Sequence, residues 1–116
     1  MSDSDCLFCR IAEGSVAADV VREDEHLVAF RDINPQAPTH ILIIPRKHMP
    51  SVSELKEEDE GLIGKLFLAA KELARAEGIA DRGYRMVINA GAEAGQTVFH
   101  VHLHLLGGRG MDWPPG

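Results

Sequence analysis

Apolar residues recur at helical spacing in two segments of the chain. In residues 6–12 they are followed by Gly14, a stop signal for a short helix. Residues 57–77 form the clearest helical pattern, which Gly78 is expected to end. The apolar stripe of this second segment consists of Leu62, Leu66, Ala69 and Leu73, beside Ile63, Phe67, Ala70 and Ala74. The pattern predicts one short and one long helix.

Five further apolar segments have the composition and length of strands. Residues 20–21 and 26–31 flank a polar stretch and predict a hairpin, and residues 41–44 are mainly β-branched and end at a proline. Residues 84–89 and 99–106 supply two more strands, joined by a glycine-bearing loop. We therefore predict an α+β fold in which one mostly antiparallel sheet carries the long helix on one face.

The composition predicts one folded domain spanning residues 1–116, because 45% of the residues are hydrophobic and 26% are charged. Eighteen acidic against twelve basic residues give a formal charge of −6, which argues against binding of a nucleic-acid polymer. The apolar runs are about five residues long, far below the roughly 18 that cross a bilayer. No cationic segment accompanies Asp3 and Asp5 at the N-terminus, so we expect no signal peptide and a cytoplasmic location.

Histidines alternate with apolar residues in segment 100–106. On a strand, His100, His102 and His104 would line one face, roughly 7 Å apart, while the residues between them enter the core. This spacing suits separate roles along a substrate better than three ligands closing on one ion. One such histidine is often a satisfied polar residue, but three in register each need partners and titrate near neutrality. The pattern favours a functional site.

The loop before this strand has the residues of an anion site. Gly91 and Gly95 allow backbone amides to turn toward an anion, and Gln96 and Thr97 add side-chain donors. The alternative is an ordinary hairpin loop, which often needs one such glycine. Because the loop runs directly into the histidines, we interpret it as a phosphate cradle.

The complete strand pattern, ending in two apolar residues, resembles the signature of the histidine triad superfamily. The resemblance extends over nearly the whole chain, including residues 32–33, 35–40, 83–87 and the C-terminal tail 107–116. The tail, with its tryptophan, is similar to the histidine triad nucleotide-binding branch rather than to the dinucleoside polyphosphate hydrolases. The resemblance implies a HIT-like fold of five strands, a homodimer with a continuous sheet across its interface, and hydrolysis of purine nucleoside phosphoramidates.

The resemblance also implies catalytic roles. His102 would attack phosphorus and form a nucleotidyl-histidine intermediate that water hydrolyses, as suits an imidazole that is largely neutral at about pH 7. His104 and His40 would flank it and contact phosphate oxygens or the departing amine. A backbone carbonyl near His100 would hold the N–H of His102. Which histidine protonates the amine stays open.

Further residues are assigned to the nucleotide on the same basis. Asp32 would accept hydrogen bonds from the ribose, and Trp113 would reach the site of the partner subunit. The expected phosphate contacts are Asn89, Gly95, Gln96, Thr97 and the amide of Val98. The expected contacts of the base are Leu7, Phe8, Ile11, Phe30 and Ile33. For these apolar residues, burial in the core is an equal alternative.

Two residues separate Cys6 from Cys9, the spacing found in many structural zinc sites. Resemblance to bacterial-type histidine triad proteins and to galactose-1-phosphate uridylyltransferases suggests His48 and His100 as the other two ligands. Such a zinc would be structural, and catalysis would need no cofactor. The alternative is a pair of half-buried thiols in a helix.

Three other functions remain open. A dinucleoside polyphosphate hydrolase or nucleotidyl transferase would use the same nucleophile. A nucleotide-binding regulatory protein would turn substrate over only incidentally. A metal-dependent hydrolase would use the alternating histidines as ligands.

Overall fold

The computed structural model describes residues 5–116, so Asp3 lies outside the described residues. The elements, in chain order, are α1 (Leu7–Ala12), β1 (Val20–Glu23), β2 (Leu27–Arg31), β3 (Thr39–Pro45), the 3₁₀ turns Val52–Glu54 and Glu57–Asp59, α2 (Glu60–Ala76), β4 (Tyr84–Val87) and β5 (Leu103–Gly107). None of the helices in this part of the chain is long and apolar enough to cross a membrane.

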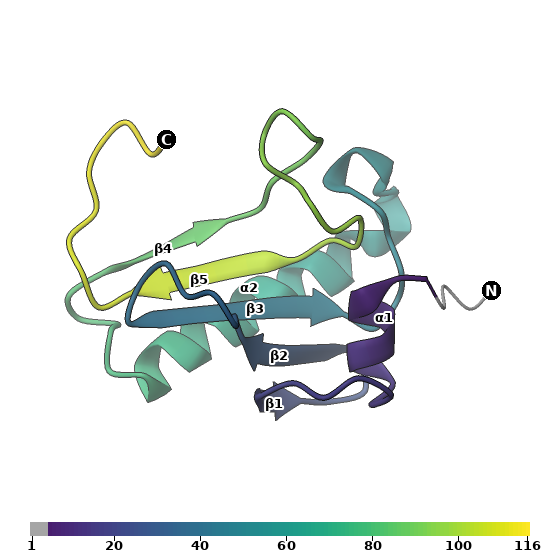
Figure 1. The fold of residues 1–116 in the computed structure, drawn as a ribbon, viewed down its shortest axis with the longest axis horizontal. Helices are drawn as coiled ribbons and strands as arrows, with labels where there is room; N and C mark the ends of the chain where they lie inside the picture. The colour runs from purple at the N-terminus through teal and green to yellow at the C-terminus, as the bar shows by residue number, and fades with distance from the viewer. Residues whose placement is uncertain (1–4) are drawn as a thin grey trace.

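The strands form one sheet in the order β1-β2-β3-β5-β4, and every neighbouring pair is antiparallel. Helix α2 runs along one face of the sheet, and α1 lies on the other face beside the end of β3 (Figure 1). The predicted α+β fold with a five-stranded antiparallel sheet is confirmed. The sheet therefore lies between the two helices, with α2 on one face and α1 on the other (Figure 1).

Each face of the sheet has its own apolar core. Under α2, β3 contributes Ile41 and Ile43, which pack with Leu66 of the helix. Under α1, β3 contributes Leu42 and Ile44. Alternate side chains of a strand point to opposite faces, so β3 is buried on both sides, as its β-branched composition predicts.

Several predicted boundaries need correction. The predicted strand 99–106 begins only at Leu103, because the preceding residues bend: Val101 donates its N–H to the carbonyl of Met49 instead of to a strand. The predicted strand 84–89 ends at Val87, and β1 extends through the polar Glu23. The ends of these three strands depend on pairing with a neighbouring strand, and the hydrophobic periodicity of the sequence does not reveal such pairing.

The long helix begins later than predicted, because residues 57–59 form a 3₁₀ turn before α2. It ends at Ala76, just before the predicted stop Gly78, whose φ of +76° places it in the left-handed region that favours glycine. Phe67 of the predicted stripe is 41% exposed, so it lies beyond the strip of α2 that the sheet covers. The other predicted stripe residues are buried or half-buried.

Candidate active site

The histidine segment alternates as predicted, although its first half precedes the strand. Val101 and Leu103 belong to the core under α2. The rings of His100 and His102 lie on the other face, where both contact Phe8 of α1 edge-on. The His104 ring follows His102 at a centroid distance of 4.9 Å. His100 and His102 therefore share a face although both precede the paired strand.

The backbone holds the imidazole of His102 in one tautomer. Its Nδ1 lies 2.7 Å from the carbonyl oxygen of His100, and because a carbonyl only accepts, Nδ1 carries the proton. In the neutral ring Nε2 is therefore unprotonated and available as a nucleophile. Phe8 packs against this ring with a centroid distance of 5.0 Å, which fixes its orientation. The predicted carbonyl contact is confirmed.

His40 and His104 form a hydrogen-bonded pair on neighbouring strands. The backbone N–H of Gln36 donates to Nδ1 of His40 at 3.0 Å, so neutral His40 carries its proton on Nε2. That Nε2 donates to Nδ1 of His104, 2.9 Å away, and also lies 3.5 Å from a carboxylate oxygen of Asp32. Neutral His104 therefore carries its proton on Nε2, which makes this atom a donor for a bound anion.

Burial keeps these three rings neutral at pH 7. Loss of hydration lowers the pKa of His40, and the Asp32 carboxylate partly opposes this shift. Loss of hydration also lowers the pKa of His102, against the opposing effects of the His100 carbonyl and of Asp32. For His104, burial and then the charges of His102 and His40 lower the pKa to about 4. The site therefore offers one unprotonated nitrogen beside a neutral donor.

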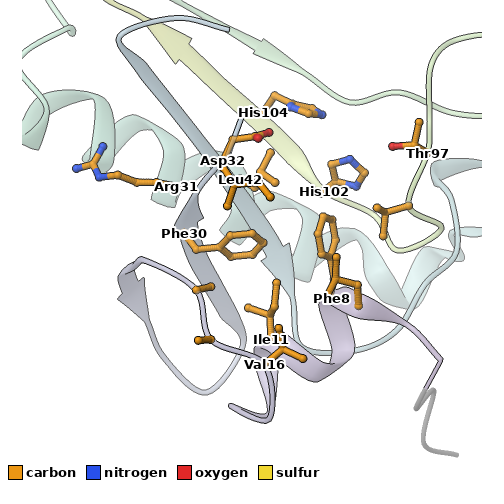
Figure 2. Close-up of a pocket in the computed structure, with 15 residues that line it drawn as sticks. Phe8, Ile11, Val16, Phe30, Arg31, Asp32, Leu42, Thr97, His102 and His104 are labelled. Atoms are coloured by element: carbon orange, nitrogen blue, oxygen red, sulfur yellow. The ribbon is translucent and has the colours of Figure 1, made fainter. Parts of the chain in front are cut away.

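An apolar pocket of about 430 Å³ opens beside His102 and His104. Figure 2 shows Phe8 and Ile11 of α1 and Phe30 of β2 around its apolar part. This volume falls in the range of small-molecule sites, about 300–1,000 Å³. The predicted nucleotide contacts that line the pocket are Leu7, Phe8, Ile11, Phe30, Asp32, Ile33, Thr97 and Val98.

Other predicted contacts do not line this pocket, namely Asn89, Gly95, Gln96 and Trp113. The side chain of Gln96 is buried and used within the fold: Oε1 accepts from the N–H of Gly91 at 2.9 Å, and Nε2 donates to the carbonyls of Pro50 and Val98. The Gln96 side chain therefore connects its own loop to Pro50, and both of its N–H groups are used within the protein, so it has no donor left for phosphate. Gly91 and Gly95 have φ of +91° and +98°, which the predicted loop requires.

Sequence reasoning missed part of the pocket. Leu42 lines it, and the signal was present because Leu42 is two positions beyond His40 on one strand and so shares its face. Residues 16–18 also line it, but they form an irregular segment after α1 without a periodic pattern. Arg31 lines the pocket with part of its side chain, whereas its guanidinium points away (Figure 2) and pairs with Glu77, which directly follows α2.

A second cluster joins Cys6, Cys9, His48 and His100, whose ligand atoms all lie within 4.8 Å of one another. Cys6 caps α1, and its Sγ accepts from the N–H of Cys9. His100 donates its Nε2–H to the carbonyl of Pro45 at 2.8 Å, so its Nδ1 faces the thiols unprotonated. The four residues predicted as metal ligands are thus brought together.

The spacing of these four atoms fits a tetrahedral metal site. With Zn–S of about 2.3 Å and Zn–N of about 2.0–2.1 Å, neighbouring ligand atoms would lie about 3.3–3.8 Å apart. The Sγ of Cys9 lies 3.3 Å from Nδ1 of His48 and 3.5 Å from Nδ1 of His100, and the two nitrogens are 3.2 Å apart. Two sulfurs and two imidazoles are a usual ligand set for zinc, so donor chemistry and geometry agree.

Comparisons with known proteins identify relatives along most of the chain. The model of the HIT domain matches residues 13–111. An uncharacterized HIT-like protein of Synechocystis sp. is 53% identical over 97% of both chains. A HIT family hydrolase of Legionella pneumophila is 54% identical, with a TM-score of 0.95 over 96% of this chain and 99% of that one. The histidine triad nucleotide-binding protein of Candida albicans is 30% identical, with a TM-score of 0.79 over 94% and 82%.

Proposed function

The chain belongs to the HIT-domain family, it is similar to HIT family hydrolases, and on this basis we propose that it hydrolyses purine nucleoside 5′-phosphoramidates. The observation that carries the proposal is the tautomer of His102, whose Nε2 is unprotonated beside an apolar pocket. This arrangement suits attack on a phosphorus whose nucleoside occupies the pocket. We assign the protein to the nucleotide-binding branch because of its tryptophan-containing tail.

In the proposed complex, the base lies between the apolar side chains of α1 and β2. Phe8 and Phe30 pack edge-on at 5.5 Å and offer ring surface to a purine. Asp32 lines the pocket directly after β2, where its carboxylate can accept hydrogen bonds from the ribose hydroxyls. Thr97 and the amide of Val98 lie at the pocket beside His102 and donate to the α-phosphate.

The reaction proceeds in two displacements on phosphorus. Nε2 of His102 forms a bond to phosphorus, the P–N bond of the substrate breaks, and the amine leaves with that electron pair and takes up a proton from solvent. Water then attacks phosphorus and gives a proton to solvent, the bond to Nε2 breaks with its electron pair returning to that nitrogen, and the nucleoside monophosphate is released. The Nε2–H of His104 donates to a phosphoryl oxygen during both steps, which stabilises the charge that develops there. His40 orients His104 through their hydrogen bond.

We further propose that the Cys6, Cys9, His48 and His100 cluster binds one structural zinc ion. Bound zinc would link α1 to the segments before α2 and before β5, which lie far apart in the sequence. It would lie outside the row of His40, His102 and His104, so catalysis uses none of its chemistry.

We also propose that the protein is a cytoplasmic homodimer. Strand β4 is an edge of the sheet and exposes Met86, and α2 exposes Phe67 and Leu68. Unpaired edge strands and exposed apolar side chains are features that a partner covers. A second copy paired through β4 would extend the sheet across the interface.

A substrate panel tests the proposed activity. Wild type and His102→Asn would be assayed with adenosine phosphoramidates, acyl-adenylates and dinucleoside polyphosphates. We expect wild type to favour the phosphoramidates and His102→Asn to lose turnover with all three classes. Preference for dinucleoside polyphosphates would overturn the substrate assignment, and turnover dependent on added metal would indicate a metal-dependent hydrolase.

A further inference from the structure

Strand β4 places a cation on the same face of the sheet as the active-site histidines. Arg85 pairs with Leu106 of β5, and Leu106 pairs with His40 of β3, so these residues form one row across the sheet. Directly paired residues of antiparallel strands project to the same face. His104 stands in the next row, so its Cα lies about 7–8 Å diagonally from that of Arg85.

Apart from the histidines, the strand residues nearest to Arg85 on this face are apolar, and the carboxylate at the histidines, Asp32, lies beside His40. The next row contains Leu42, His104 and Val87, and β2 adds Phe30. Arg31 of β2 projects to the opposite face, where it pairs with Glu77, which directly follows α2. Among the described strand residues, Arg85 is therefore the arginine that projects to the histidine face, whereas Arg31 reaches the pocket only with part of its side chain.

Arg85 also belongs to a cluster of arginines without carboxylate partners. Arg82, Arg85 and Arg109 line a hollow of about 180 Å³ between the start of β4 and the C-terminal segment, which continues beyond the edge of the sheet in Figure 1. Arg85 donates to the carbonyl of Asp112 at 3.0 Å, and Arg109 donates to the carbonyls of Gln36 and Gly110.

Three of the other arginines pair with acidic side chains, whereas Arg10 and Arg75 form no such ion pair within residues 5–116. Arg22 pairs with Glu72, Arg31 with Glu77 and Arg46 with Glu23. No such ion pair reaches the three arginines of the hollow within residues 5–116. In a chain with a net charge of −6, three guanidinium groups without carboxylate partners in one hollow give that place a local positive charge, which attracts an anion.

We infer that Arg85, flanked by Arg82 and Arg109, binds an anionic group on the leaving half of the substrate. This inference rests on the proposed function. The nucleoside and the leaving group share one phosphorus, so when the nucleoside fills the apolar pocket by α1, the leaving group extends elsewhere over the histidine face. The row from His40 through Leu106 leads to Arg85. The matching ligand is a carboxylate, as on an amino-acid amine, or a phosphate.

Binding to the His102→Asn variant tests the subsite without turnover. The probes are the adenosine phosphoramidates of glycine, which carries a carboxylate, and of glycinamide, which is neutral and of similar size. We expect calorimetry to show about tenfold tighter binding of the glycine probe, the gain typical of one charge-assisted hydrogen bond. Adding Arg85→Gln removes this preference, whereas Arg75→Gln, on the exposed side of α2, retains it. The affinities of ADP and AMP are compared in the same way, because ADP carries a second phosphate where the glycine probe carries its carboxylate. The larger of the two gains in affinity identifies the preferred anion.

Equal affinity for the charged and neutral members of both probe pairs, or a preference that survives Arg85→Gln, overturns the inference. If Arg85→Gln does not fold, Arg109→Gln carries the same test, because its side chain lines the same hollow. Turnover by wild type separates this result from the proposed function. Hydrolysis of the glycinamide probe without any preference for an anion rejects the subsite alone. A preference for the anion without hydrolysis rejects the phosphoramidase alone.

Discussion

His100 contributes two separate groups to this molecule. Its ring lies in the Cys and His cluster, while its backbone carbonyl accepts the Nδ1–H of His102. The residue that orients the nucleophile is therefore also the one that joins the cluster to the site. His104 depends in the same way on His40, which supplies the proton for its Nδ1 acceptor. The ring of His102 is thus oriented by an acceptor, the His100 carbonyl, and the ring of His104 by a donor, the Nε2–H of His40.

The buried neutral state of His104 predicts a loss of stability in acid. Its pKa is about 4 in the folded protein and about 6.5 in an unfolded chain, so between these values the unfolded state binds more protons. The free energy of unfolding therefore falls as the pH falls from 7 to 5. Thermal melts should show this slope, and His104→Gln should make it shallower. An NMR titration that places the His104 pKa at 6.5 or above would contradict the account.

At the residue scale, sequence predicted the alternating histidines because a period of two is a property of the strand itself. It also placed Asp32 and the apolar residues of α1 at the pocket, through family resemblance. The use of Gln96 within its own loop could not be predicted, because its partners Pro50 and Gly91 lie at unrelated positions in the sequence.

At the scale of elements, the types of helix and strand were predictable and several ends were not. Strand β5 begins only at Leu103 because the residues before it have other partners. The ring of His100 donates to the carbonyl of Pro45, the last residue of β3, and the N–H of Val101 donates to the carbonyl of Met49, which follows β3. Such tertiary partners override local propensity. In contrast, the end of α2 just before Gly78 follows from a local backbone requirement, and Gly78 was predicted correctly as the residue that stops the helix.

The end of β5 is packed tightly against the segment after α2. A Cβ added at Gly107 would lie 2.5 Å from Cδ1 and 3.1 Å from Cβ of Ile79, whereas at Gly110 it would meet nothing within 4 Å. We expect Gly107→Ala to lower the free energy of unfolding by about 1–3 kcal/mol, the usual cost of overpacking. Gly110→Ala is the matched control. Denaturant unfolding measures both, and equal stability of the two variants would argue against this close contact.

The cluster at the N-terminus of α1 predicts one zinc ion per chain. Elemental analysis of purified protein should find about one equivalent, and Cys9→Ser or His48→Asn should lose it and melt at a lower temperature. His26→Asn, a change at an exposed histidine outside the cluster, should retain the metal. Protein that is metal-free and as stable as the metal-loaded form would refute the site.

At the scale of the whole molecule, the two faces of the sheet have different tasks. The face under α2 contains the larger apolar core, and the face under α1 contains the pocket and the histidines. Because β3 contributes side chains to both, the site stands on a strand that is buried on both sides. The sequence predicted the long helix on one face and the β-branched strand, but it did not predict that α1 and the pocket lie on the other face.

The C-terminal tail predicts a link between assembly and selectivity. Trp113 is 83% exposed, and in the proposed homodimer it reaches the site of the other subunit. Deleting residues 112–116 should alter the preference among leaving amines more than the melting temperature. Turnover of a panel of phosphoramidates measures the preference, thermal melts measure the stability, and analytical ultracentrifugation measures the oligomeric state. A monomeric protein, or unchanged selectivity after deletion, would count against this role.

Covalent trapping tests the nucleophile most directly. An alkaline quench during turnover of a labelled phosphoramidate should leave nucleotide bound to wild-type protein, because a phosphorus bond to histidine is labile in acid. His102→Asn should still bind nucleotide but carry no label, whereas His104→Gln should turn over about 10²- to 10⁴-fold more slowly and still become labelled. The account predicts that mass spectrometry places the nucleotide on His102. Hydrolysis by His102→Asn at nearly the wild-type rate would contradict it.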